Sequence, residues 1–403
     1  MYFAFWQNVF KRIFGYLSEG GFEVNEIYLD HAATTYTKPE VLKVMLPYFN
    51  EKYGNASSIY TIGQEAKIAV ENARKQVANA IGANSEEIYF TAGGSESDNL
   101  IISGFARANK KRGRHIITSK IEHMAVIKTC MSLEKEGFEV TYLNVDKDGM
   151  ISIDELRKAI RPETILISIM FANNEIGTIQ PIKEIGKIAR KNNIFFHTDA
   201  VQAVGNIKID VKELNIDALS MSGHKFYGPK GIGALYVRKG MDFEPIIHGG
   251  HQEANKRAGT ENVPGIVGIG KAIELASSNI EEYNQKLIKL RDYYVQEVFE
   301  KIPNVKLNGH ESIRLPGNAN ISFQGIEGET LLLLLSSSGI YASSGSACNS
   351  GNMAPSHVLA AIGLSNEMSR GALRVTFGDE NTLKDVEYLV FKLESFVRRM
   401  REM

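Results

Sequence analysis

The sequence predicts an α/β protein in which helices cover both faces of a mostly parallel sheet, with a smaller α/β domain after it. Two observations lead to this fold class. Strand and helix patterns alternate from about residue 60 to about residue 240, as in successive βαβ units. Several strand patterns, such as TILISIMFA, are continuous apolar runs, which is typical of strands buried on both faces.

The elements follow in a regular order. The amphipathic segment TIGQEAKIAVENARKQVANAIGA predicts a helix that ends at Gly82, and EIYFT predicts a strand that a Gly/Ser turn joins to a helix from Glu96. Another helix is expected over 124–136, and SIDELRKAI is a helix that Ser152 caps, with Glu155 three residues further on. A proline opens the helix PIKEIGKIARKNN, and the remaining strands are expected in RHIITSKIEH, EVTYLNV, TILISIMFANN, NIFFHTDA, IDALSMS and GIGALYVRKG.

The pattern changes to long helix around residues 265–300, and strands and short helices follow. We therefore expect a large domain over residues 35–280 and a small domain built from residues 24–34 and 281–403. Residues 1–23 form an amphipathic N-terminal extension with an aromatic-rich face. Such a segment is either an interfacial anchor or partner-binding helix, or a non-essential extension.

Composition excludes several classes of protein. The formal net charge of −1 argues against a dedicated nucleic-acid binder, and no apolar run reaches the roughly 20 residues that span a bilayer. The two cysteines, Cys130 and Cys348, do not form a disulfide framework and suggest a reducing cytoplasm, although a single bridge between them stays open. Cys130 fits a helical pattern as a buried apolar residue. His248 and His251 have no third ligand at metal spacing, so no metal site is predicted.

A lysine and a carboxylate stand where predicted buried strands end. Asp199 ends IFFHTDA, and Lys225 follows IDALSMS in the sequence SGHK. Ligands of a doubly wound sheet lie beyond the carboxyl ends of its strands, and a carboxylate buried there is costly without a cationic partner. A protonated pyridine ring supplies that partner and the lysine can form its Schiff base, so the pair predicts a pyridoxal phosphate site. The alternative, a solvated surface lysine, is weakened because Asp199 and Lys225 each end a strand pattern and lie 26 residues apart, the length of one crossover.

Three further positions are candidate site residues once this pair is recognised. Gly94 and Ser95 follow a strand and open a helix, where main-chain amides suit a phosphate, although an ordinary βα turn looks the same. His123 follows another strand and either stacks on a planar ring and moves a proton or is structural. Arg374, in the strand pattern GALRVTFGD, is either a fork for a substrate carboxylate or a surface arginine.

Cys348 lies in an uncharged loop, YASSGSACNSGNMAPS, that is rich in small residues. Such a loop should be mobile, which suits a sulfur that visits a buried site and then presents itself outside. The local sequence supplies no cation to stabilise a thiolate. Activation must therefore come from elsewhere, for example from His123 or the bound substrate.

The chain resembles the pyridoxal-phosphate cysteine desulfurases of the NifS/IscS type, in the fold-type-I class-V aminotransferase superfamily. The matching segments run in family order from about Ile27 to the C-terminus and are specific together: YLDHAATT, GNASSIY, TAGGSESDN, EHMAV, NNEIGTIQPI, HTDAVQAVG, SGHKFYGPKGIGALYV, GGHQE, RAGTENV, SSGSAC and LRVTFG. The first stretch of about 25 residues exceeds the usual family start, so nothing is carried over to it.

The resemblance implies a role for each matching residue. It implies that Lys225 is the Schiff-base lysine, Asp199 the pyridinium partner, His123 the ring that stacks on the cofactor and Cys348 the sulfur acceptor. It also implies that Gln202 contacts the phenolic oxygen and that Asn174 and Arg374 bind the substrate carboxylate. The phosphate is implied to be bound by Gly94, Ser95, Ser222 and His224, and by Thr260 from the other subunit of a homodimer.

The implied reaction converts L-cysteine to L-alanine and leaves a persulfide on Cys348, which passes sulfur to an acceptor, typically an iron–sulfur scaffold protein, or toward other thio-cofactors. A transient iron–sulfur cluster contact at Cys348 stays open. Two other interpretations remain: a related lyase or aminotransferase such as a selenocysteine lyase, and a catalytically silent partner that binds cofactor and docks a scaffold. Alanine formation that depends on Cys348 distinguishes them.

Overall fold

The computed structural model describes residues 26–344 and 356–402, so the predicted extension over residues 1–23 lies outside the described part. A seven-stranded sheet forms its centre, in the order β2-β8-β7-β6-β5-β3-β4. β8 runs antiparallel to both of its neighbours and the other pairs are parallel, which confirms a mostly parallel sheet. Its strands are β2 (Ile88–Thr91), β3 (His115–Ser119), β4 (Glu139–Leu143), β5 (Thr164–Ser168), β6 (Phe195–Asp199), β7 (Ala218–Ser222) and β8 (Gly233–Val237).

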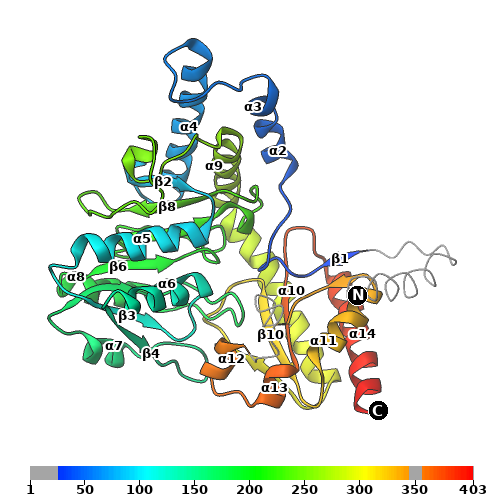
Figure 1. The fold of residues 1–403 in the computed structure, drawn as a ribbon. Coiled ribbons are helices and arrows are strands. Elements are labelled where there is room, and N and C mark those ends of the chain that lie inside the picture. The colour runs from blue at the N-terminus through cyan, green and yellow to red at the C-terminus, as the bar shows by residue number, and fades with distance from the viewer. Residues whose placement is uncertain (1–25, 345–355, 403) are drawn as a thin grey trace, which may run out of the picture.

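Helices cover both faces of this sheet (Figure 1). Neighbouring side chains along one strand enter opposite cores: Phe195 packs with α5 and α6 on one face, and Phe196 packs with the helices of the other. This alternation is why the strands read as continuous apolar runs. The covering helices are α5 (Gly94–Asn109) and α6 (Met124–Lys135) on one face, and α4 (Thr61–Ala80), α7 (Ile153–Ala159), α8 (Ile182–Lys191) and α9 (Val263–Ser278) on the other.

A second, antiparallel sheet has the order β12-β10-β9 and its own apolar core. Its strands are β9 (Val305–Asn308), β10 (Asn318–Phe323) and β12 (Ala372–Thr376), and its main helices are α10 (Ile280–Lys301), α11 (Gly328–Ser337) and α14 (Leu383–Arg401). Beside it, β1 (Ile27–Tyr28) pairs in parallel with β11 (Ile340–Tyr341). The short helices α12 (His357–Ala361) and α13 (Asn366–Arg370) lie at the lower edge of the molecule in Figure 1, with α12 on the side nearer the large sheet.

Local sequence predictions agree with the structure, with two differences. The Ser152 hydroxyl accepts a hydrogen bond from the Glu155 N–H, as predicted for the cap of α7, and Cys130 is buried in the core under α6. The helix expected from Glu96 begins at Gly94, and the long helix near residues 265–300 is two helices, because the backbone leaves the helical region at Asn279. Among the described residues, no helix is long and apolar enough to cross a bilayer.

Two short helices, α2 (Pro39–Met45) and α3 (Pro47–Asn50), precede α4 at the end of the molecule away from the second sheet (Figure 1). Proline stands in the first turn of each, where its missing N–H costs no helical hydrogen bond.

Candidate active site

The residues that follow β3, β5, β6 and β7 meet the start of α5 around a cavity of about 310 Å3. This is the position that a doubly wound sheet offers to a ligand. Thr260 does not line the cavity and is exposed on the same chain, and Cys348 lies outside the described residues. The other predicted site residues all line it: Gly94, Ser95, His123, Asn174, Asp199, Gln202, Ser222, His224, Lys225 and Arg374.

Asp199 presents a buried carboxylate at the end of β6. Its Oδ1 accepts a hydrogen bond of 2.9 Å from the Val201 N–H, which holds the carboxylate in place at the C-terminal end of the strand. Burial raises the pKa of Asp199, while the nearby charges of His123 and Lys225 oppose that shift. A cationic ring nitrogen in the cavity would stabilise the ionised form, so this carboxylate fits a pyridinium.

Lys225 ends the short 3-10 turn η2 (Gly223–Lys225) that follows β7. Its ammonium donates hydrogen bonds to the carbonyl oxygens of Ala32, at 2.5 Å, and Ala33, at 2.8 Å. The Gln202 amide also donates to Ala32 O, at 2.9 Å. The N-terminal segment that follows β1 therefore forms one wall of the cavity and holds the amine inside it.

His123 stands at the N-cap of α6, where its Nδ1 accepts a hydrogen bond of 3.2 Å from the Ala125 N–H. Because Nδ1 accepts, a neutral ring carries its proton on Nε2. A ring nitrogen of His123 and a carboxylate oxygen of Asp199 lie within 4.8 Å of each other. The imidazole is thus fixed by the helix start beside the carboxylate, where it can stack on a ring or move a proton.

One end of the cavity suits a phosphate group. Gly94 begins α5, and its first-turn amides have no acceptor within the helix. A Cβ on Gly94 would lie 2.5 Å from Cγ2 of Val201, so a larger residue there would force the Val201 side chain to move. His224 lies beside it, and its Nδ1 is 3.1 Å from the Thr34 hydroxyl oxygen. Burial, followed by the charges of Lys225 and Lys230, lowers the pKa of His224 to about 4, so it acts as a neutral hydrogen-bonding group.

The other end holds Arg374, which β12 of the second sheet supplies. Its Nη2 pairs with the Asp30 carboxylate at 2.7 Å, and its Nη1 donates to Asn174 O at 3.1 Å. Its Nε is buried and makes no hydrogen bond within the described part of the chain. The guanidinium is therefore held in place and keeps donor capacity for an incoming carboxylate.

Sequence reasoning missed two parts of the cavity. The carbonyls of Ala32 and Ala33 carry no side-chain signal, although they lie in the matching segment YLDHAATT. Asp98 also lines the cavity and is fully buried, yet in the sequence it reads as a polar residue in the first turns of a helix. The signal that could have found it is position: it lies one helical turn after Gly94.

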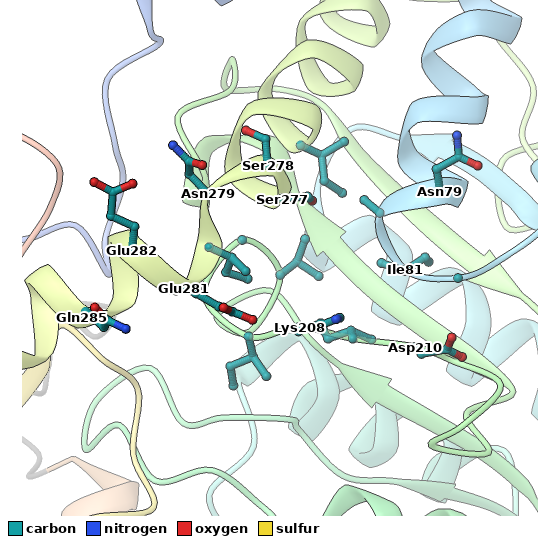
Figure 2. A pocket seen from close by; sticks show the side chains of 18 residues that line it. Asn79, Ile81, Lys208, Asp210, Ser277, Ser278, Asn279, Glu281, Glu282 and Gln285 are labelled. Carbon is teal, nitrogen blue, oxygen red and sulfur yellow. The ribbon is translucent and has the colours of Figure 1, made fainter.

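A larger cavity, of about 710 Å3, lies elsewhere, between the end of α4, the segment after β6 and the junction of α9 with α10 (Figure 2). Its polar lining includes Lys208, Asp210, Glu281 and Glu282. It contains none of the predicted site residues, and no histidine or cysteine lines it. Size alone therefore does not identify the reaction site.

Comparison with known proteins agrees with the geometry. The aminotransferase class-V family matches residues 27–389. The chain is similar to the protein named "Cysteine desulfurase IscS" of Methanosarcina thermophila, with 59% identity over 94% of both chains. Among solved structures it is similar to a "NifS-like protein" (TM-score 0.88, 40% identity, 93% of this chain and 100% of that one) and to "SspA in complex with cysteine" (TM-score 0.77, 40% identity, 87% and 98%).

The matches cover both sheets and every described residue of the cavity. The chain therefore belongs to the class-V aminotransferase family and, within it, to the pyridoxal-phosphate-dependent cysteine desulfurases of the NifS/IscS type.

Proposed function

We propose that this chain removes sulfur from L-cysteine, releases L-alanine and carries the sulfur as a persulfide on Cys348. The observation that carries the proposal is the meeting of Asp199, Lys225 and Arg374 around one cavity, from the end of β6, the turn after β7 and the middle of β12 in the second sheet. The solved relative described as "in complex with cysteine" supports the choice of substrate.

The described residues fit pyridoxal phosphate. Asp199 offers the buried carboxylate for the ring nitrogen, Lys225 the amine for covalent attachment, and His123 a planar neighbour. Gln202 would contact the phenolic oxygen, and Gly94, Ser95, Ser222 and His224 would hold the phosphate. When bound, this cofactor supplies an electron sink that weakens bonds at the α- and β-carbons of an amino acid.

The chain's own residues position the substrate and move its protons. Arg374 and Asn174 bind the cysteine carboxylate, and Lys225 takes and returns the proton at the α-carbon. Cys348 then accepts the substrate sulfur. In balance, the Cβ–S bond of cysteine breaks, a proton is added at Cβ, and an S–S bond forms on Cys348, which changes from thiol to persulfide.

The functional unit is a homodimer. An apolar surface lies on α3 and the segment that leads into α4, with Phe49 62%, Tyr53 70% and Ile59 94% exposed. Apolar side chains gathered in this way are typical of a surface that a partner covers. At the phosphate end, a neighbouring hollow of about 600 Å3 is lined by Ser95, His224 and others, which leaves room for Thr260 of a second copy.

Three broader expectations complete the proposal. The sulfur acceptor is an iron–sulfur scaffold or another acceptor protein, and a cytoplasmic location fits the presence of two cysteines in the whole chain. Residues 35–280 form the large domain, and residues 24–34 and 281–403 the small one. In support, the core under the second sheet joins Ile27 to residues from Leu287 onward.

Mass spectrometry after incubation with L-cysteine tests the proposal. We expect an addition of about 32 Da, one sulfur atom, on the peptide that carries Cys348, together with alanine in solution. In the Cys348→Ala variant we expect the cofactor absorbance to stay and alanine formation from cysteine to stop. Alanine formation at the full rate by that variant would rule out Cys348 as the acceptor and favour a lyase.

A further inference from the structure

Asp98, on α5, is a buried carboxyl group whose oxygens have no hydrogen-bond partner in the described part of the chain. The residue is 0% exposed and lines the cavity proposed for the cofactor. Buried polar atoms are nearly always paired in folded proteins. An unpaired carboxyl group facing a cavity therefore points to a partner that arrives with a ligand.

More carboxyl groups than basic side chains surround Asp98. An oxygen of Asp98, an oxygen of Asp199 and a nitrogen of His123 all lie within 4.8 Å of one another. Glu122, after β3, is a further fully buried carboxyl group nearby. Behind Asp98, the His197 ring on β6 lies 3.6 Å away.

His197 does not act as a cation for Asp98. Its two ring nitrogens already bond the hydroxyls of Ser168, at 2.9 Å, and Ser220, at 3.0 Å. Burial lowers the pKa of His197 to about 3, so the ring is neutral near pH 7. Burial, then the nearby carboxyl groups of Asp199 and Glu122, raise the pKa of Asp98 well above its ordinary range; the nearby Ser220 hydroxyl, which forms no hydrogen bond of normal geometry with Asp98, opposes that shift.

We propose that Asp98 is a positioning residue which stays a neutral carboxylic acid and donates its hydrogen bond to Asp199, so that Asp199 remains the ionised partner of the cofactor ring. Two carboxylates this close in a buried site do not both ionise when a single pyridinium is present. Asp199 accepts one hydrogen bond at Oδ1 from the Val201 N–H, which leaves acceptor capacity on the carboxylate that a cationic ring nitrogen and the Asp98 hydroxyl would use. The inference rests on the proposed cofactor site.

The test is the affinity of the apoprotein for pyridoxal phosphate, followed by visible absorbance. Asp98→Asn keeps a neutral donor of the same shape, and we expect its dissociation constant to lie within about threefold of the wild type. Asp98→Ala removes the donor, and we expect binding at least about tenfold weaker. The pH profile of the bound cofactor's absorbance should be retained in Asp98→Asn and displaced in Asp98→Ala.

A matched control is Asp217→Asn, since Asp217 is another buried aspartate that pairs with Arg238 away from the cavity. It should lower thermal stability and leave cofactor affinity unchanged. Weak binding by Asp98→Asn equal to that of the alanine variant would overturn the inference, because it would make Asp98 an ionised counter-charge. Wild-type binding by Asp98→Ala would overturn it as well.

If Asp98→Ala does not fold, Asp98→Val takes its place, since valine fills more of the space left by the aspartate side chain and has no donor. The Asp98→Asn arm decides the question in either case. Wild-type protein that binds no pyridoxal phosphate at all would instead contradict the proposed function.

Discussion

Replacing Glu122 with glutamine should make the apoprotein more stable at alkaline pH and leave it nearly unchanged at acid pH. The Glu122 carboxyl group is fully buried; the Met170 N–H donates to its oxygens at 3.0 and 2.9 Å and the Ser119 hydroxyl lies at 2.5 Å. Burial raises the pKa of Glu122 from 4.5 to about 8, with a smaller effect from Asp199, against the two hydrogen bonds.

The sign follows from which state holds the proton. Above pH 4.5 the unfolded chain has lost the Glu122 proton, whereas the folded chain keeps it up to about pH 8. Wild-type stability is therefore complete below pH 4.5 and falls as pH rises to about 8. At about 1.4 kcal/mol per pH unit the limit is about 5 kcal/mol, and relaxation of the site reduces the expected effect to about 1–3 kcal/mol.

The measurement is urea unfolding of the apoprotein at about pH 5 and about pH 8.5, comparing wild type with Glu122→Gln. Glutamine can accept from Met170 and donate to Ser119, so it reproduces the neutral acid. Glu311→Gln, at an exposed position, serves as the control and should behave like the wild type at both pH values. The same difference between wild type and Glu122→Gln at both pH values would refute the reasoning.

Three other outcomes are expected. Lys225→Ala should abolish borohydride trapping of the cofactor on the protein and alanine formation, and trapping at full yield would place the attachment at another lysine. Arg374→Lys should raise KM for cysteine about tenfold with a smaller change in kcat, because an ammonium cannot replace the planar fork that Asp30 holds; steady-state kinetics checks this, and an unchanged KM would contradict the carboxylate role. Phe49→Asp together with Ile59→Asp should convert the proposed dimer to monomer in analytical ultracentrifugation, while a dimer of unchanged affinity would place the interface on another surface.

The sequence predicted the cavity residues that follow strands of the large sheet better than the cavity residues that other elements supply. Asp199 and Lys225 could be paired because each follows an apolar run, and runs of this kind end at one edge of a parallel sheet. Arg374 could not be brought to them by that argument, since it comes from an antiparallel strand in the second sheet.

Two kinds of cavity residue could not be predicted from the sequence, for physical reasons. The carbonyl oxygens of Ala32 and Ala33 belong to the backbone, so their side chains say nothing of the contact with Lys225. Asp98 lies at a helix position where an acid is usually solvated, and only the packing of α5 on the sheet buries it. Burial of a single polar residue depends on tertiary contacts rather than on local pattern.

The wall formed by the N-terminal segment has a consequence for how the enzyme matures in the cell. Ala32 N–H bonds the Thr376 hydroxyl at 2.9 Å, and Ile27 pairs with Ile340, so the earliest described part of the chain is anchored on one of the last to be synthesised. A nascent chain still on the ribosome has therefore not yet formed the cavity wall, the Ala32 and Ala33 carbonyls, that binds the Lys225 amine. Cofactor loading should wait for release of the finished polypeptide, which spares unfinished chains from trapping a reactive aldehyde.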